Sequence, residues 1–206
     1  MNLYVEEYDM KIVVGMSGGV DSAVVALMMK QAGHDVTGIM MSIWDGPVTG
    51  GTKKNACYGP DEKEDIDEAA QICDTIGIPF RVYDCAEKYR ETVLSYFKKE
   101  YMSARTPNPC IKCNHQMKFG VLLDEARKSG LRFDAFATGH YARIERDPST
   151  GRYCLLKALD RKKDQSYFLY RLSQEQLAMA MFPLGAMKKS DVRKIAEENG
   201  LQVFDK

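Results

Sequence analysis

The sequence has no excess of charge, no long apolar run and few cysteines. Its 29 lysines and arginines balance its 29 aspartates and glutamates, so a nucleic-acid partner would have to be held by a local basic patch. No apolar run approaches the ~20 residues that span a bilayer, and the acidic segment 1–7 lacks the apolar region of a signal peptide. Six cysteines among 206 residues are too few for a disulfide framework, which favours reduced thiols. We therefore expect a cytoplasmic protein without a membrane segment.

The composition and the length are those of a globular protein with one well-buried core. Hydrophobic residues make up 45% and charged residues 28% of the chain, which excludes a disordered or collagen-like protein. The length corresponds to roughly 1.4 domains of ordinary size, enough for one core and an appendage.

Strands and helices alternate along the first two thirds of the chain. Runs of β-branched residues predict strands, and apolar positions at helical spacing predict helices. The predicted strands cover 11–16, 35–44, 80–83 and 134–138, and the predicted helices cover 20–33, 61–76, 86–102 and 116–129. This alternation is typical of an α/β fold with a doubly wound parallel sheet, whose ligands bind beyond the carboxyl ends of the strands.

Two other stretches depart from this alternation. The segment 45–60 is a long loop rich in glycine, and long loops of this kind are often functional. After residue 163, two short helices are predicted at 172–181 and 188–199, with Ser173 and Ser190 as N-caps.

A loop of small residues joins the first strand to the first helix. Glycines and a helix N-terminus let backbone N–H groups approach an anion, the serines add hydroxyl donors, and Asp21 can hold a magnesium ion or orient the loop. It matches neither the Walker A pattern nor the dinucleotide G-x-G-x-x-G pattern. The loop consists of Gly15, Met16, Ser17, Gly18, Gly19, Val20, Asp21 and Ser22. Its Ser-Gly-Gly-Val-Asp-Ser part resembles the pyrophosphate loop of ATP pyrophosphatases, which adenylate a substrate oxygen.

A second motif, at 106–114, contains two cysteines between prolines and a predicted helix. Pro107 and Pro109 interrupt a helix, so we expect Cys110 and Cys113 in a stiff loop that precedes the helix at 116–129. A helix N-terminus and the nearby cations Arg105, Lys112 and Lys118 would lower the pKa of Cys113. The other cysteines, Cys57, Cys73, Cys85 and Cys154, are interpreted as packing or surface residues.

The residues alone leave three interpretations of Cys110 and Cys113 open. A structural zinc site would need four ligands; His115 could be a third, but there is no second C-x-x-C. A thioredoxin-type redox pair would lack its usual strand–helix context. The third interpretation is a sulfur-handling nucleophile or a pair of cluster ligands.

Two further motifs make the resemblance specific. Residues 137–141 read Ala-Thr-Gly-His-Tyr, and residues 163–169 read Lys-Asp-Gln-Ser-Tyr-Phe-Leu. Together with the pyrophosphate loop and Thr-Pro-Asn-Pro at 106–109, they resemble the bacterial tRNA-specific 2-thiouridylases over residues 11–205. The resemblance implies a pyrophosphatase-type adenylation domain at 1–171 and the start of a small helical central domain at 172–206, without the family's C-terminal β-barrel.

The resemblance also implies the reaction and its partners. ATP, with Mg²⁺, adenylates the C2 oxygen of the wobble uridine of tRNA and releases pyrophosphate. Sulfur from a donor protein or sulfide then attacks C2, and AMP leaves. The partner is therefore tRNA rather than DNA or a membrane, and the flipped base pays a cost for leaving its stack.

Residue roles follow from the same resemblance. The loop from Gly15 to Ser22 holds the ATP phosphates, Met41 lies on the adenine, and Gly139 contacts the nucleotide. Asn108, Pro109 and Cys110 border the uridine, and His140, Lys163, Asp164 and Gln165 contact tRNA. The residues around Lys163 would form the basic patch, which consists of Lys157, Arg161, Lys162 and Lys163. Without the resemblance, a buried core histidine satisfied by backbone groups is the alternative for His140, and a solvated charged turn would be the favoured interpretation of the patch.

The chain departs from the family pattern at two places. Many members have aspartate at position 110, whereas the Cys-x-x-Cys variant resembles members that bind a 4Fe–4S cluster through Cys110 and Cys113. The family's other essential cysteine follows a stretch that begins about where 204–206 stand. We therefore expect an N-terminal part that binds ATP and tRNA but cannot complete sulfur transfer. Two alternatives to this function remain: a related synthetase that adenylates a small molecule, and a non-catalytic fragment that binds tRNA or ATP.

Overall fold

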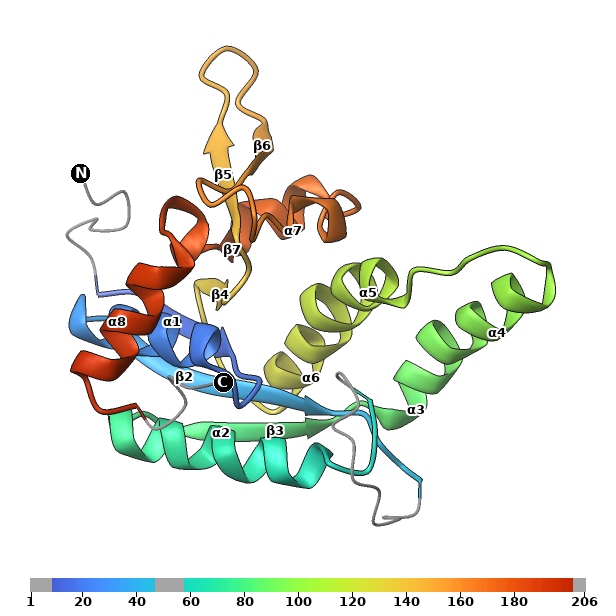
Figure 1. Cartoon of the computed structure of the whole chain (residues 1–206), viewed down its shortest axis with the longest axis horizontal. Coiled ribbons are helices and arrows are strands. Elements are labelled where there is room, and N and C mark those ends of the chain that lie inside the picture. Colours follow the sequence, from blue (N-terminus) through green and yellow to red (C-terminus); the bar gives the residue numbers. More distant parts are fainter. Residues whose placement is uncertain (1–8, 47–57, 202–206) are drawn as a thin grey trace.

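The computed structural model describes residues 9–46 and 58–201, and its centre is a five-stranded parallel sheet (Figure 1). The strand order is β3-β2-β1-β4-β7, and all four pairings are parallel. The strands are β1 (Lys11–Gly15), β2 (Asp35–Ser42), β3 (Phe80–Asp84), β4 (Ala135–Thr138) and β7 (Ala180–Met181). The predicted α/β fold with a doubly wound parallel sheet is confirmed, because the order reverses direction at β1.

Helices cover both faces of the sheet. The main ones are α1 (Val20–Gln31), α2 (Glu62–Ile76), α3 (Ala86–Tyr89), α4 (Ser95–Met102), α5 (Pro109–Lys112), α6 (Leu122–Lys128), α7 (Gln174–Met179) and α8 (Lys189–Glu198). Two π-helical segments, η1 (Arg90–Leu94) and η2 (Cys113–Val121), continue α3 into α4 and α5 into α6, and two 3-10 turns are η3 (Ser166–Phe168) and η4 (Pro183–Ala186).

Alternating residues of β1 divide the core between these faces. Val14 packs with α1, α2 and α8 on one face, whereas Val13 packs with η2 and α6 on the other. Because both faces are covered, consecutive residues of the central strands are buried rather than alternating, as in Ile12, Val13 and Val14 of β1 and the whole of β4.

The predicted cysteine loop is wrong in one respect. Pro109 is the first residue of α5, and the Asn108 side chain caps the helix by accepting a hydrogen bond from the Ile111 N–H at 3.3 Å. Proline is tolerated at a first helical position because that N–H has no intrahelical partner. Cys110 and Cys113 therefore lie on the first turns of a helix, not in a loop before it.

The segment after residue 171 packs on the same sheet as the rest of the chain. The strand β7 joins the same sheet beside β4, and Val192 and Ala196 of α8 are buried in the core that contains α1. A two-residue strand is too short to show a periodic pattern, which is why the sequence missed it. Ser173 is the N-cap of α7 as predicted, and the structure shows that it does so in a capping box with Gln176. α8 begins after Lys188, so Ser190 is not its N-cap.

A β-hairpin that the sequence analysis missed projects from the sheet (Figure 1). It consists of β5 (Ala142–Arg146) and β6 (Tyr153–Lys157), which pair antiparallel. Most of the predicted loop 45–60, together with Cys57, lies outside the described residues. Among the described helices, none is long and apolar enough to cross a bilayer.

Candidate nucleotide-binding site

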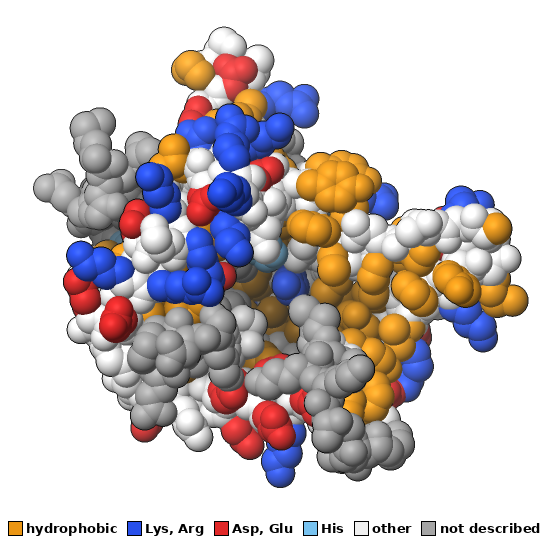
Figure 2. Space-filling model, viewed as in Figure 1, with side chains coloured by type: hydrophobic (Ala, Val, Ile, Leu, Met, Phe, Trp, Pro, Cys, Tyr) orange, Lys and Arg blue, Asp and Glu red, His pale blue; other side chains and the backbone are white. Residues whose placement is uncertain are grey.

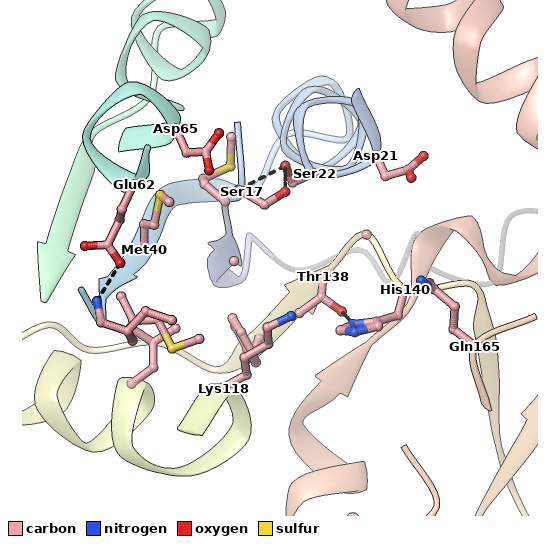
Figure 3. Close-up of a pocket in the computed structure, with 17 residues that line it drawn as sticks. Ser17, Asp21, Ser22, Met40, Glu62, Asp65, Lys118, Thr138, His140 and Gln165 are labelled. Carbon is pink, nitrogen blue, oxygen red and sulfur yellow. Dashed lines mark hydrogen bonds between the residues drawn. The ribbon is translucent and has the colours of Figure 1, made fainter. Parts of the chain in front are cut away.

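A cavity of about 310 Å³ lies beyond the carboxyl ends of β1, β2 and β4 (Figure 3). Its walls come from the loop before α1, the end of β2, the start of α2, the helix through η2, and the segment after β4. The lining residues are Gly15, Met16, Ser17, Asp21, Ser22, Met40, Met41, Ile43, Glu62, Asp65, Lys118, Leu122, Phe136, Thr138, Gly139, His140 and Gln165. This is the edge at which open parallel sheets bind ligands.

The predicted phosphate loop forms the turn from β1 into α1. Gly18 adopts a positive φ of +67°, which an L side chain rarely tolerates. The Ser17 N–H donates to the Ser22 hydroxyl at 3.3 Å, and that hydroxyl donates to the Gly19 carbonyl at 3.0 Å. These bonds hold the loop over the N-terminus of a 12-residue helix, whose partial positive charge suits an anion.

Asp21 is the centre of a polar group that the sequence analysis only partly anticipated. Its Oδ1 accepts a hydrogen bond from the Tyr141 hydroxyl at 2.9 Å and one from the Lys189 ammonium at 2.6 Å. Lys189 comes from α8, and its backbone N–H donates to Asp160. Burial first, and then the neighbouring Asp21 charge, raise the pKa of Tyr141. The phosphate loop is therefore tied to the last described helix through one carboxylate.

Glu62 is a second carboxylate that the sequence analysis missed. It accepts hydrogen bonds from the Ile43 N–H and the Ser42 hydroxyl, both at 2.6 Å, and from the Trp44 N–H at 3.1 Å. The carboxylate fixes the chain where it leaves β2, and so shapes the wall that carries Met40 (Figure 3) and its neighbour Met41.

His140 lies in the wall of the cavity rather than on an open surface. Its Nδ1 lies 2.8 Å from the Thr138 hydroxyl, and its ring lies 6.3 Å from Phe119 and 6.0 Å from Phe182, between centroids. Burial, together with the charge of Lys118, lowers the pKa of His140 to about 3. The imidazole is therefore neutral at physiological pH.

This shift predicts a pH dependence of stability. Between pH 6.5 and about 3, the unfolded chain binds a proton at His140 that the folded chain does not bind. The contribution of neutral His140 to the free energy of unfolding is therefore fully present above the unfolded pKa. It is lost as the pH drops through this window, by about 1 kcal/mol per pH unit. Urea unfolding at pH 7 and pH 5 should show this loss, and His140→Gln should reduce it.

His115 is retained in both proteins, so its own lowered pKa cancels from the comparison. An identical pH dependence in the wild type and His140→Gln would show that the His140 pKa is not depressed.

The structure splits the other predicted site residues into two sets. From the phosphate-loop set and its neighbours, Gly15, Met16, Ser17, Asp21, Ser22, Met41 and Gly139 line the cavity, whereas Gly18, Gly19 and the buried Val20 support the turn. From the expected tRNA set, His140 and Gln165 line the cavity, and Asn108, Pro109, Cys110, Lys163 and Asp164 do not. Asp164 holds its own turn by accepting hydrogen bonds from the Ala158 N–H and the Ser166 hydroxyl.

The two candidate cysteines stand one turn apart outside the cavity lining. Cys110 is exposed, whereas Cys113 is buried in a cluster with Ile43, Cys85 and Met117. Of the cations expected beside them, Arg105 forms an ion pair with Glu100 at 2.6 Å, and Lys118 lines the cavity. Cys73 and Cys85 are buried and Cys154 is exposed, as the packing and surface interpretation requires.

An iron–sulfur cluster needs more ligands than this part of the chain provides. Within residues 9–46 and 58–201, no group of three His, Cys, Asp or Glu side chains is placed to hold a metal ion. Two cysteines do not complete a four-ligand cluster or zinc site, so the described residues do not fit either group.

The open parallel sheet, the phosphate loop at the start of α1 and the cavity beyond the strand ends define an α/β nucleotide-binding domain. More narrowly, the chain belongs to the family described as the tRNA methyl transferase HUP domain, whose model matches residues 10–206.

Curated relatives agree with the resemblance seen in the motifs. The chain is 50% identical over 202 residues to the tRNA-specific 2-thiouridylase MnmA of Endomicrobium trichonymphae, covering 97% of this chain and 56% of that protein. It is 47% identical over 199 residues to the protein of the same name from Geotalea uraniireducens, covering 95% of this chain and 52% of that protein. The chain therefore spans about half the length of the curated relatives it matches.

Solved structures agree with the fold. An NMN synthetase from Francisella tularensis superposes with a TM-score of 0.54 at 18% identity, covering 96% of this chain and 65% of that one. A predicted subunit of a tRNA methyltransferase from Methanocaldococcus jannaschii superposes with a TM-score of 0.53 at 16% identity, covering 92% of this chain and 75% of that one. At these identities the likeness concerns the fold alone.

Proposed function

We propose that this chain is the ATP- and tRNA-binding part of a tRNA-uridine 2-sulfurtransferase. It binds ATP in the cavity and adenylates the C2 oxygen of the wobble uridine of tRNA in the cytoplasm. The observation that carries the proposal is the cavity itself, which brings the phosphate loop together with His140 and Gln165 from two motifs of the 2-thiouridylase resemblance.

Different residues of the cavity bind the phosphates, the adenine and the magnesium ion of ATP. Backbone N–H groups of the loop from Gly15 to Ser22 hold the phosphates at the N-terminus of α1, and Met41 packs on the adenine. Asp21 offers a carboxylate of the kind that Mg²⁺ prefers, and the ion supplies neutralisation of phosphate charge. Among the described residues, Lys118 is the one lysine in the cavity lining. It provides positive charge opposite the phosphate loop.

The proposed reaction activates a poor leaving group. The C2 oxygen of uridine attacks the α-phosphorus of ATP, the bond to the β-phosphate bridge breaks, and pyrophosphate leaves. Attack by sulfur at C2 then displaces AMP. Cys113, with the exposed Cys110 as its neighbour on the same helix, is our candidate for accepting a persulfide sulfur from a donor protein, whose own thiol is regenerated. Sulfide, in contrast, would attack C2 directly without passing through a cysteine.

Exchange of labelled pyrophosphate into ATP tests the adenylation step. The 206-residue chain should catalyse exchange with a tRNA that has uridine at the wobble position, and not with the same tRNA carrying cytidine there. Small carboxylic acids are the matched alternative substrates. Exchange with a small acid and none with tRNA would instead identify a small-molecule synthetase, and ATP binding without any exchange would identify a non-catalytic binding fragment.

A further inference from the structure

Two exposed tyrosines, Tyr167 and Tyr170, closely follow the cavity-lining residue Gln165 in the sequence. Tyr167 is 64% exposed and Tyr170 is 62% exposed. Their ring centroids lie 6.3 Å apart with the planes tilted by 36°, so the two rings form one local aromatic surface. Leu169 between them is buried, which shows that the segment is anchored by one residue while it presents the two rings to solvent.

Hydrogen bonds fix this segment between the cavity and the cysteine helix. At one end, Gln165 lines the cavity and its side chain accepts from the Tyr141 N–H at 2.9 Å. In the middle, the Asn114 amide donates to the Phe168 carbonyl at 3.3 Å. The segment that carries the tyrosines therefore begins in the cavity wall and is held in its middle by the helix that carries Cys113.

The surroundings of the tyrosines are positively charged. Lys162, Lys163 and Arg171 are all exposed within a few residues of the two rings. Figure 2 shows that lysine and arginine side chains group on one face of the molecule, beside a hydrophobic surface in the region of α5 and α4. Exposed aromatic rings with neighbouring cations are the chemistry that binds unpaired nucleotides, because bases stack on the rings and phosphates pair with the cations.

We propose that Tyr167 and Tyr170 are a stacking platform for the unpaired bases that flank the nucleotide entering the cavity. This inference rests on the proposed function and specifies how its RNA is held. Another exposed aromatic pair, Phe97 and Tyr101 on α4, has centroids 6.2 Å apart, but its helix contributes no residue to the cavity lining. That pair is the matched control.

Fluorescence titration tests the platform with the 206-residue chain. The probe is an anticodon stem-loop RNA with uridine at the wobble position and 2-aminopurine as the next base. Wild type should bind the RNA and quench the 2-aminopurine by stacking. Tyr167→Ala with Tyr170→Ala should weaken binding by about tenfold or more and abolish quenching. Tyr167→Phe with Tyr170→Phe should keep both, and so should Phe97→Ala with Tyr101→Ala.

The possible results separate the two proposals. The salt dependence of binding should stay the same in the double alanine variant, because no charge is removed. Wild-type affinity and quenching in that variant would overturn the platform while leaving the proposed function intact. Failure of the wild type to bind the stem-loop at all would overturn both. Self-association of the wild type that the alanine substitutions abolish would show that a second copy, not RNA, covers the tyrosines.

Discussion

Substitution of Gly185 by alanine is expected to lower the free energy of unfolding by about 3 kcal/mol or more. A Cβ atom at this position would lie 1.7 Å from the Ala142 carbonyl oxygen and 2.6 Å from its carbonyl carbon. Both are backbone atoms, so no change of rotamer relieves the overlap. The backbone of either η4 or β5 has to move.

The damage should spread from this contact to the cavity. Ala142 begins β5 and directly follows His140 and Tyr141, and the Gly185 carbonyl accepts a hydrogen bond from the Leu159 N–H at 2.8 Å. Movement of η4 therefore strains the segment that forms one cavity wall. Urea unfolding measures the loss of stability, and titration with ATP measures the accompanying loss of affinity.

Gly120→Ala is the matched control for this substitution. Gly120 lies inside η2, and a Cβ there would have its nearest neighbour, the His115 carbonyl oxygen, at 3.6 Å. Alanine at this position should be neutral or stabilise the protein by up to about 1 kcal/mol, because glycine carries an entropic cost in a helix. Equal stability of the Gly185→Ala and Gly120→Ala proteins would contradict the close packing of η4 on β5.

The sheet and the phosphate loop could be predicted because their signals are local. β1 is a short β-branched run that ends in glycine, and Gly18 and Gly19 directly precede the apolar first turns of α1, so neighbouring residues carried the information. The resemblance also located Gly139, His140 and Gln165, which do line the cavity.

The contacts that complete the site were not predictable in the same way. Asp21 and Lys189 are 168 positions apart, and nothing in either neighbourhood indicates that they meet. Glu62 resembles any acidic residue in the first turn of a helix, yet it binds the end of β2. Proline breaks a helix at an interior position but is tolerated at its first residue. Pro109 occupies a first position, which only the Asn108 cap reveals.

Substitution of Asp21 by asparagine is expected to weaken the binding of ATP with Mg²⁺ by about a hundredfold. Asparagine keeps the size of the side chain but removes the negative charge that meets the Tyr141 hydroxyl and the Lys189 ammonium on one oxygen. The lysine, whose side chain is only 15% exposed, is left without its partner, and the loop loses its carboxylate for the ion. Isothermal titration with ATP and Mg²⁺ measures the effect.

Lys189 variants test whether Asp21 supports ATP binding alone or through its ion pair with Lys189. If the ion pair orders the loop, Lys189→Met should also weaken ATP binding, whereas Lys188→Met at the exposed neighbouring position should not. Because the two groups share one contact, Asp21→Asn combined with Lys189→Met should cost less than the sum of the single losses. Strict additivity in this double-mutant cycle would mean that α8 does not support the phosphate loop, and unchanged affinity in Asp21→Asn would remove Asp21 from the nucleotide site.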